Sequence, residues 1–150
     1  MSAEPIISSL KNENKFLTDV KTPRHEFQID EPERVGGTDK APDPVEMSLG
    51  ALGACTAMTL KMYYVHKKVD WTQIDVHVHS ELRKIDKETA SEAVQAMANN
   101  GKGRYGKKTI YINSDMDEKS LERASIIAEK CPVNLMMKNG CMMETVVERV

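Results

Sequence analysis

The first part of the chain alternates short apolar runs with turn-forming residues. Residues 4–10 and 15–20 are each predicted to form a strand, and a turn follows each of them. The segment 24–30 has the period-two pattern of a half-buried strand, because its apolar and polar positions fall on opposite faces. One face carries His25, Phe27 and Ile29. Residues 31–44, with three prolines and a Gly-Gly pair, are predicted to form a long loop.

From Pro44 onward the apolar positions recur every three or four residues, which predicts an amphipathic helix that ends near residue 67. Pro44 suits the first turn, and Asp43 before it is the expected N-cap. The expected apolar stripe consists of Leu49, Leu52, Cys55, Met58, Met62 and Val65. A second face carries only small residues, among them Gly50 and Gly53. Because glycine destabilises a helix interior, this face is predicted to lie against another backbone.

The remaining pattern predicts a mixed α and β order. A long strand is expected over 71–85, a short helix within 86–100, a mobile basic loop at 101–108 and a strand at 109–113. A helix is expected to start with Ser114 or Asp115 as its cap. Its apolar stripe would hold Leu121, Ala124, Ala128 and Cys131. A short helical turn should then end at Gly140, and residues 141–150 should form a final strand.

The composition indicates one soluble globular domain spanning 1–150. Hydrophobic residues make up 40% of the chain and charged residues 29%, and the net charge is −2. No basic stripe stands out, so nucleic acid is not an expected partner. No apolar run is long enough to cross a membrane, and the first residues do not read as a signal peptide. We therefore expect a cytoplasmic protein that is not bound to a membrane.

The three cysteines, Cys55, Cys131 and Cys141, are the candidates for chemistry. A free cysteine is often a small buried hydrophobe, so core filling is one interpretation of Cys55. Cys131 precedes Pro132, which disfavours a helical backbone there and makes Cys131 the expected N-cap of the next helix. The helix dipole would lower the pKa of such a thiol. A fold could bring Cys55 and Cys131 together, whereas Cys141 is interpreted as a packing residue.

Two stretches carry a resemblance to a known family. The segments "DEPERVGGTDKAPDPVEMSLGALGACTAMTLKMYYVHKK" and "LERASIIAEKCPVN" resemble the OsmC and organic-hydroperoxide-resistance (Ohr) proteins. The resemblance implies an α+β fold, with curved antiparallel sheets packed on two long helices in an intertwined homodimer. It also implies that Cys55 is the peroxidatic thiolate and Cys131 the resolving thiol, which form a disulfide. The implied reaction reduces organic hydroperoxides to alcohols with an external dithiol reductant, and needs no metal or other cofactor.

The family further implies an arginine, held by a glutamate, that stabilises the reactive thiolate. Arg24 is the candidate, because "RHEFQIDEP" is similar to one branch of the family; a solvated charge at a strand end is the alternative. Glu46 is the candidate carboxylate. The peroxidase branches have Asn-Pro-Glu here, and this chain places Glu46 one residue later, about 100° around a helix. Asn134 stands where many relatives have histidine.

Other interpretations remain open. His77 and His79 share a strand face, but without a third ligand at usable spacing a solvent-facing pair is expected rather than a metal site. The basic run at 101–108 is interpreted as a solvated loop. Besides hydroperoxide reduction, the chain could be a protein of the same fold that binds a small apolar ligand with weak or no turnover. It could also be a helical packing module with inert core cysteines.

Overall fold

The computed structural model describes residues 4–86, 88, 92–96, 98 and 100–149. The chain divides into two compact units, residues 1–50 and 51–150, and each is considered by itself. Both contain antiparallel β-structure, and helices dominate the rest of the second unit. The predicted α+β class with antiparallel sheets is therefore confirmed, while the intertwined homodimer stays a prediction.

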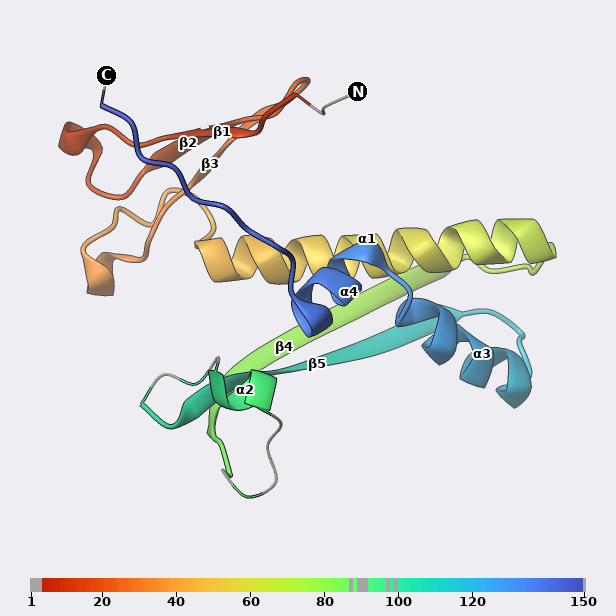
Figure 1. Cartoon of the computed structure of the whole chain (residues 1–150). Coiled ribbons are helices and arrows are strands. Elements are labelled where there is room, and N and C mark those ends of the chain that lie inside the picture. Colours follow the sequence, from red (N-terminus) through yellow and green to blue (C-terminus); the bar gives the residue numbers. More distant parts are fainter. Residues whose placement is uncertain (1–3, 87, 89–91, 97, 99, 150) are drawn as a thin grey trace. The chain divides into compact units, whose positions relative to one another are not determined.

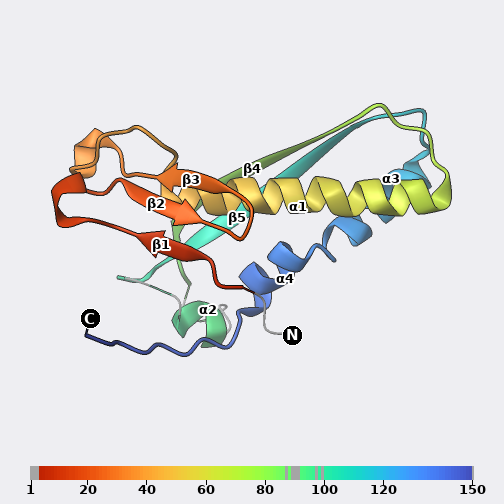
Figure 2. The same cartoon turned by 90° about the horizontal axis from the view of Figure 1, so that it is seen from above.

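The first unit is built on a three-stranded antiparallel meander, shown in Figure 2. Its strands are β1 (Ile7–Ser9), β2 (Thr18–Lys21) and β3 (Glu26–Ile29). The first predicted turn is a 3-10 helix, η1 (Asn12–Asn14), and a second one, η2 (Glu33–Val35), lies in the predicted loop. The three predicted strands are thus confirmed with shorter bounds.

The long loop after β3 is organised around the buried carboxylate of Asp30. One oxygen accepts hydrogen bonds from the Thr38 hydroxyl at 2.5 Å and from the Thr38 and Lys40 N–H groups at 3.1 Å each. The other accepts the Glu31 N–H at 2.8 Å. The Thr38 hydroxyl and these N–H groups outweigh burial and lower the pKa of Asp30 to about 2. Gly37 is required in this loop, since a Cβ there would lie 1.6 Å from the Glu31 carbonyl oxygen.

Helix α1 (Pro44–Lys67) forms over the predicted range, but a different stripe is buried. The buried positions are Leu52, Gly53, Thr56, Leu60 and Tyr64. The expectation for three members of the apolar stripe was wrong: Met58, Met62 and Val65 are 63%, 67% and 64% exposed. Of the two glycines named on the small face, Gly53 is buried, whereas Gly50 is exposed and a Cβ there would meet nothing within 4 Å, so the predicted close approach was wrong for Gly50.

The neighbour of Gly53 is strand β4 (Gln73–Lys84). A Cβ on Gly53 would lie 3.4 Å from the Val78 Cγ2 and 3.5 Å from the Val76 carbonyl oxygen. These are contact distances, so a glycine here lets the helix axis approach the strand. For Gly53, the predicted close approach of another backbone is therefore confirmed, and the backbone belongs to the same chain.

Strand β4 pairs with β5 (Lys102–Asn113) in a long antiparallel hairpin, drawn in green and cyan in Figure 1. The register runs from Gln73↔Asn113 to Lys84↔Lys102. The prediction of a mobile loop at 101–108 was wrong, because pairing with β4 incorporates most of that basic run into β5. A short helix, α2 (Glu92–Ala96), lies in the connection, as predicted.

Helix α3 (Glu118–Ala128) packs with α1 on one face of this hairpin. Its N-cap is Asp117, whose Oδ1 accepts the Ser120 N–H at 2.8 Å, and not Ser114 or Asp115 as expected. The buried core consists of Leu60, Tyr64, Ala124, Ile127 and Ala128, with Trp71, Ile74, Ile110 and Ile112 among the half-buried residues around it. Of the predicted α3 stripe, Leu121 is exposed.

Helix α4 (Pro132–Asn139) follows after a short break and is capped by Gly140, as predicted. The break makes α3 shorter than the second long helix that the family resemblance implied. The predicted final strand was wrong: residues 141–149 have no regular structure, and Met142, Met143 and Val147 are largely exposed. A strand needs a paired edge, and no described strand pairs with this segment. No helix in the described part of the chain could cross a membrane.

The Asp30 carboxylate gives the first unit a pH-dependent stability. Its pKa is lower in the folded state than the usual 3.8. Its contribution to the free energy of unfolding is therefore present above pH 4 and lost as the pH falls through about 2. We expect Asp30→Asn to lower the thermal unfolding temperature of the full chain at pH 7. The difference from the parent should shrink between pH 4 and pH 2. Asp39→Asn, exposed in the same loop, is the matched control. An equal Asp30→Asn deficit at pH 2 and pH 7 would contradict this assignment.

Candidate functional site

The second unit brings Cys55 and Cys131 together. Cys55 lies on α1, half-buried and next to the buried Thr56, and Cys131 is completely buried between α3 and α4. The two thiols interact through their side chains, and both are free cysteines. The third, Cys141, is exposed in this chain, so the expectation that it packs was wrong.

Cys131 occupies the position that its following proline predicted. It is the N-cap of α4, with an extended backbone (φ −56°, ψ 127°), and its carbonyl oxygen accepts the Leu135 N–H at 3.0 Å. Its sulfur forms no capping hydrogen bond of standard geometry. The N–H groups of Asn134 and Val133 nevertheless lie near enough to stabilise a negative charge on the sulfur.

The two thiols differ in how they hold charge. Burial alone would raise the pKa of Cys131, but the Cys55 thiol, the Asn134 N–H, Thr56 and the Val133 N–H together lower it. Burial raises the pKa of Cys55, and the Cys131 sulfur raises it further. When one thiol of the pair ionises, these groups favour the negative charge on Cys131 and leave the hydrogen on Cys55.

Thr56 adds a buried hydroxyl to this site. Its oxygen is inaccessible and has no hydrogen-bond partner of standard geometry among the described residues. A buried hydroxyl without a partner is costly. A charge on Cys131 would give the Thr56 hydroxyl an acceptor, since Thr56 is among the groups that lower the pKa of that thiol.

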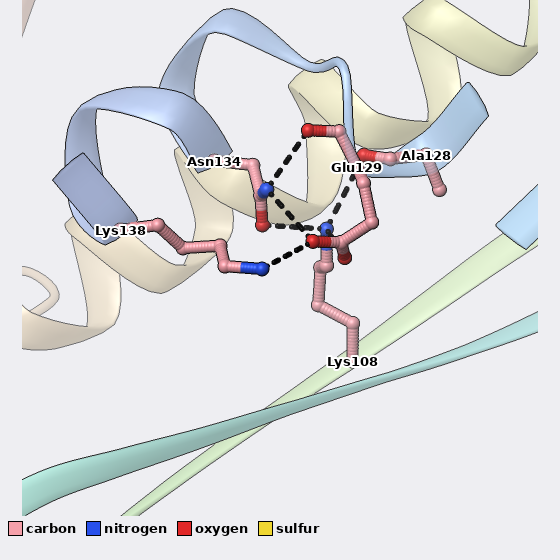
Figure 3. Close-up of polar contacts among 5 residues, drawn as sticks. All are labelled: Lys108, Ala128, Glu129, Asn134 and Lys138. Carbon is pink, nitrogen blue, oxygen red and sulfur yellow. Dashed lines mark hydrogen bonds and ion pairs between the residues drawn. The ribbon is translucent and has the colours of Figure 1, made fainter. Parts of the chain in front are cut away.

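A charged network that the sequence did not reveal joins Lys108, Glu129, Asn134 and Lys138 around the start of α4 (Figure 3). The Lys108 ammonium donates to the Asn134 Oδ1 at 2.7 Å and forms an ion pair with Glu129 at 3.4 Å. Lys138 contacts the other Glu129 oxygen at 2.7 Å. The hydrogen bond from Lys138 is the main cause that lowers the pKa of Glu129. Partial burial opposes it, and Lys108 and Asn134 lower the pKa further, so Glu129 is ionised at neutral pH.

Lys108 is the last residue of the basic run 101–108, which the sequence pattern predicts to be a solvated loop, and for Lys108 this prediction is wrong. The signal that could have found it is the strand period: Ile112 and Ile110 face the core, and the next residue in the same phase is Lys108. Its side chain is only 12% exposed.

Arg24 and Glu46 belong to the first unit. Arg24 lies in the turn between β2 and β3, where its backbone N–H donates to the Thr22 hydroxyl at 3.4 Å, and its side chain is exposed. Glu46 forms a capping box with Asp43. The Glu46 carboxylate accepts the Asp43 N–H at 3.0 Å, and the Asp43 carboxylate accepts the Glu46 N–H at 2.8 Å. Asp43 is thus the predicted N-cap, and Glu46 is held by the start of its own helix.

Among the described residues of the second unit, one cavity of about 480 Å³ and another of about 380 Å³ are each lined without a cysteine. The larger one is bordered by Tyr63, Tyr64, Val69, Met116 and charged residues of α3. Among the described residues, no group of three histidine, cysteine or acidic side chains could hold a metal ion. His77 instead packs edge-on against Tyr111, with ring centroids 4.9 Å apart.

Comparison with known proteins identifies the fold. The model of the OsmC-like protein family matches residues 37–146. An OsmC-like protein from Mycoplasma pneumoniae is 14% identical, with a TM-score of 0.67 over 91% of this chain and 88% of that one. An organic hydroperoxide resistance protein OsmC from Legionella pneumophila is 12% identical (TM-score 0.64, 93% of each chain). An organic hydroperoxide resistance protein from Elizabethkingia anophelis is 18% identical (TM-score 0.62, 92% and 91%). No curated protein sequence matches the chain.

The capping box gives a test of what Glu46 does. Gln at this position can still accept the Asp43 N–H, whereas Ala cannot. We expect Glu46→Ala to lower the free energy of unfolding by about 0.5–1 kcal/mol and Glu46→Gln to retain most of it, in denaturant titrations. If the carboxylate instead supports a reactive thiolate, Glu46→Gln would lose thiol reactivity towards hydroperoxide at unchanged stability. That result would assign Glu46 to the chemistry.

Proposed function

Because this chain belongs to the OsmC-like family and joins two thiols in one buried site, we propose that it reduces organic hydroperoxides to alcohols with an external dithiol as reductant. The observation that carries this proposal is the interaction between Cys55 and Cys131. A single thiol can be core filler, but two interacting thiols can be oxidised together. The names of the Legionella and Elizabethkingia proteins, which have the same fold, support this substrate class.

In the proposed mechanism, Cys55 is the peroxidatic residue, because it is the more accessible of the two thiols. Its proton passes to Cys131, and the Cys55 thiolate attacks the distal peroxide oxygen. The O–O bond breaks, Cys55 becomes a sulfenic acid, and the alkoxide takes the proton back from Cys131 to leave as the alcohol. Leu52, one turn before Cys55 on the same helix, and Val133 offer apolar surroundings that suit an alkyl group.

Cys131 then resolves the sulfenic acid. Its thiolate attacks the Cys55 sulfur, an S–S bond forms, the S–O bond breaks, and hydroxide leaves. The external dithiol reduces this disulfide by exchange and restores both thiols. In this proposal Arg24 supplies the cation and Glu46 the carboxylate that the family arrangement implies. The capping box is the alternative use of Glu46.

A second candidate is that the protein binds a small apolar ligand with weak or no turnover. The cavity of about 480 Å³ beside Tyr63 and Tyr64 favours it, because aromatic and apolar side chains make up part of its lining and its volume suits a small molecule. Absence of turnover in a folded protein with reduced thiols would favour this candidate.

The first proposal is tested by treating the reduced protein with cumene hydroperoxide. We expect two thiols to be lost per chain and peptide mapping to find a Cys55–Cys131 disulfide. With a dithiol donor, Cys55→Ser should lower turnover by about a thousandfold or more, as expected when a nucleophile is removed. Cys141→Ser is the matched control and should retain activity. Hydrogen peroxide, which has no alkyl group, should be the poorer substrate. Full turnover by Cys55→Ser would overturn the assignment.

We also propose that the protein is a homodimer, as the family resemblance implies. Met58, Met62 and Val65 line one face of α1, and within a single chain each is more than 60% exposed. Burying such a side chain contributes about 1.5–3 kcal/mol, so a second copy that covers this face would be strongly stabilised.

Sedimentation at low micromolar concentration should therefore give the mass of a dimer. Met62→Arg should shift the chain towards monomer or unfolded protein, because a charge would then lie in the apolar contact. A folded monomer of the parent chain under these conditions would contradict the dimer.

A further inference from the structure

Lys108 is a buried cation that reaches the residues around Cys131. From β5, its ammonium donates to the carbonyl oxygen of Ala128 at 3.3 Å as well as to the Asn134 side chain. The same Ala128 oxygen accepts the Cys131 N–H at 3.5 Å. Lys108 therefore holds both the last residue of α3 and the first turn of α4, the two segments between which Cys131 lies.

Asn134 transmits this contact to the sulfur. Its side chain is fixed at both ends, because Oδ1 accepts from Lys108 and Nδ2 donates to the Glu129 carbonyl oxygen at 3.0 Å and to a Glu129 carboxylate oxygen at 3.3 Å. Its own backbone N–H is one of the groups that favour charge on Cys131. A residue anchored in this way has little freedom to turn its N–H away from the sulfur.

We propose that Lys108 is a positioning residue for the second thiol: through Asn134 and the Ala128 carbonyl it holds the start of α4 so that the Cys131 sulfur stays beside the Asn134 N–H and in position to attack oxidised Cys55. This inference rests on the proposed function, and it assigns Lys108 to the resolving step. In that step the Cys131 thiolate displaces hydroxide from the Cys55 sulfenic acid, so its rate depends on the thiolate fraction and on the geometry of Cys131.

The charges around the site make Lys108 the informative residue to change. The groups that face Cys131 or its network are Cys55 from α1, Lys108 from β5, Glu129 after α3 and Lys138 from α4. Lys138 contacts the same Glu129 but is 63% exposed and has no described contact with Asn134. Lys138→Met therefore removes a cation from the network without removing the support of Asn134, which makes it the matched control.

The first measurement is the thiolate absorbance of Cys131 against pH, in a Cys55→Ser/Cys141→Ser background where it is the only thiol. Lys108→Met should shift the titration to higher pH, Lys108→Arg should restore part of the shift, and Lys138→Met should leave the curve nearly unchanged. An unchanged curve for Lys108→Met would overturn the proposal. Circular dichroism and thermal unfolding check that each variant is folded. If Lys108→Met does not fold, Asn134→Ala, which removes the side chain that accepts from Lys108 but keeps the backbone N–H, takes its place and is judged by the same outcomes.

The second measurement separates the two chemical steps in a Cys141→Ser background with stoichiometric cumene hydroperoxide. Sulfenic acid is trapped with dimedone, and disulfide formation is followed by mass. Lys108→Met should slow disulfide formation roughly tenfold, as expected when a charge-assisted contact to an orienting group is lost. Sulfenic acid formation should slow less, because that step uses Cys131 only to hold a proton, whereas resolution needs its sulfur both charged and aimed at Cys55. Equal slowing of both steps would overturn the assignment to resolution. If the parent does not react at all, the proposed function fails, and the thiolate titration still decides the role of Lys108.

Discussion

The close contact between α1 and β4 is the constraint on which the second unit depends. Gly53 has no side chain, so the helix lies within van der Waals distance of Val76 and Val78. This contact turns Leu52, Thr56, Leu60 and Tyr64 into the core and leaves the methionines outside. Cys55, two residues after Gly53, is placed at the edge of that buried stripe, half in contact with the protein and half accessible. A side chain larger than a methyl group at position 53 would move the helix away and the first thiol with it.

Charged groups in the site are stabilised by hydrogen bonds and ion pairs rather than by contact with water. A buried thiolate or ammonium is stable only where hydrogen bonds and opposite charges replace water. For Cys131 the hydrogen-bond donors are backbone N–H groups and the Cys55 thiol. The Lys108 ammonium donates to the Asn134 oxygen and to a backbone carbonyl, and it forms an ion pair with Glu129. Asn134 belongs to both sets, with its side chain in one and its N–H in the other. An amide suits this position, because it accepts from the lysine and donates to Glu129 at the same time and carries no charge of its own.

Local signals in the sequence predicted most of the elements but not their environment. Asp43-Pro44 and Cys131-Pro132 located two helix starts, because capping and the proline ring act within a few residues. The alternation of apolar and polar residues predicted the strands, but in β5 it predicted only residues 109–113, because the preceding residues are a basic run. Lys108 was missed since a lysine in a basic run is usually solvated, and only the strand register shows that it faces inward. The α1 stripe was misassigned because Gly53 faces β4, which leaves Met58 and Met62 on the exposed side of the helix. The last segment was predicted as a strand from composition, which says nothing about whether a partner edge exists.

The capping box shows how a shift of one residue can change the use of a carboxylate. At the third position of α1, Glu46 is placed by helix geometry to reach back to the Asp43 N–H, a contact that also fixes how the chain enters the helix. A carboxylate so engaged is less free to orient a cation elsewhere. The support of Cys131, by contrast, comes entirely from groups of its own unit, through the start of α4, Asn134 and Lys108. The second thiol thus has a built electrostatic environment, and the Cys55 thiol is one of the groups that favour a charge there.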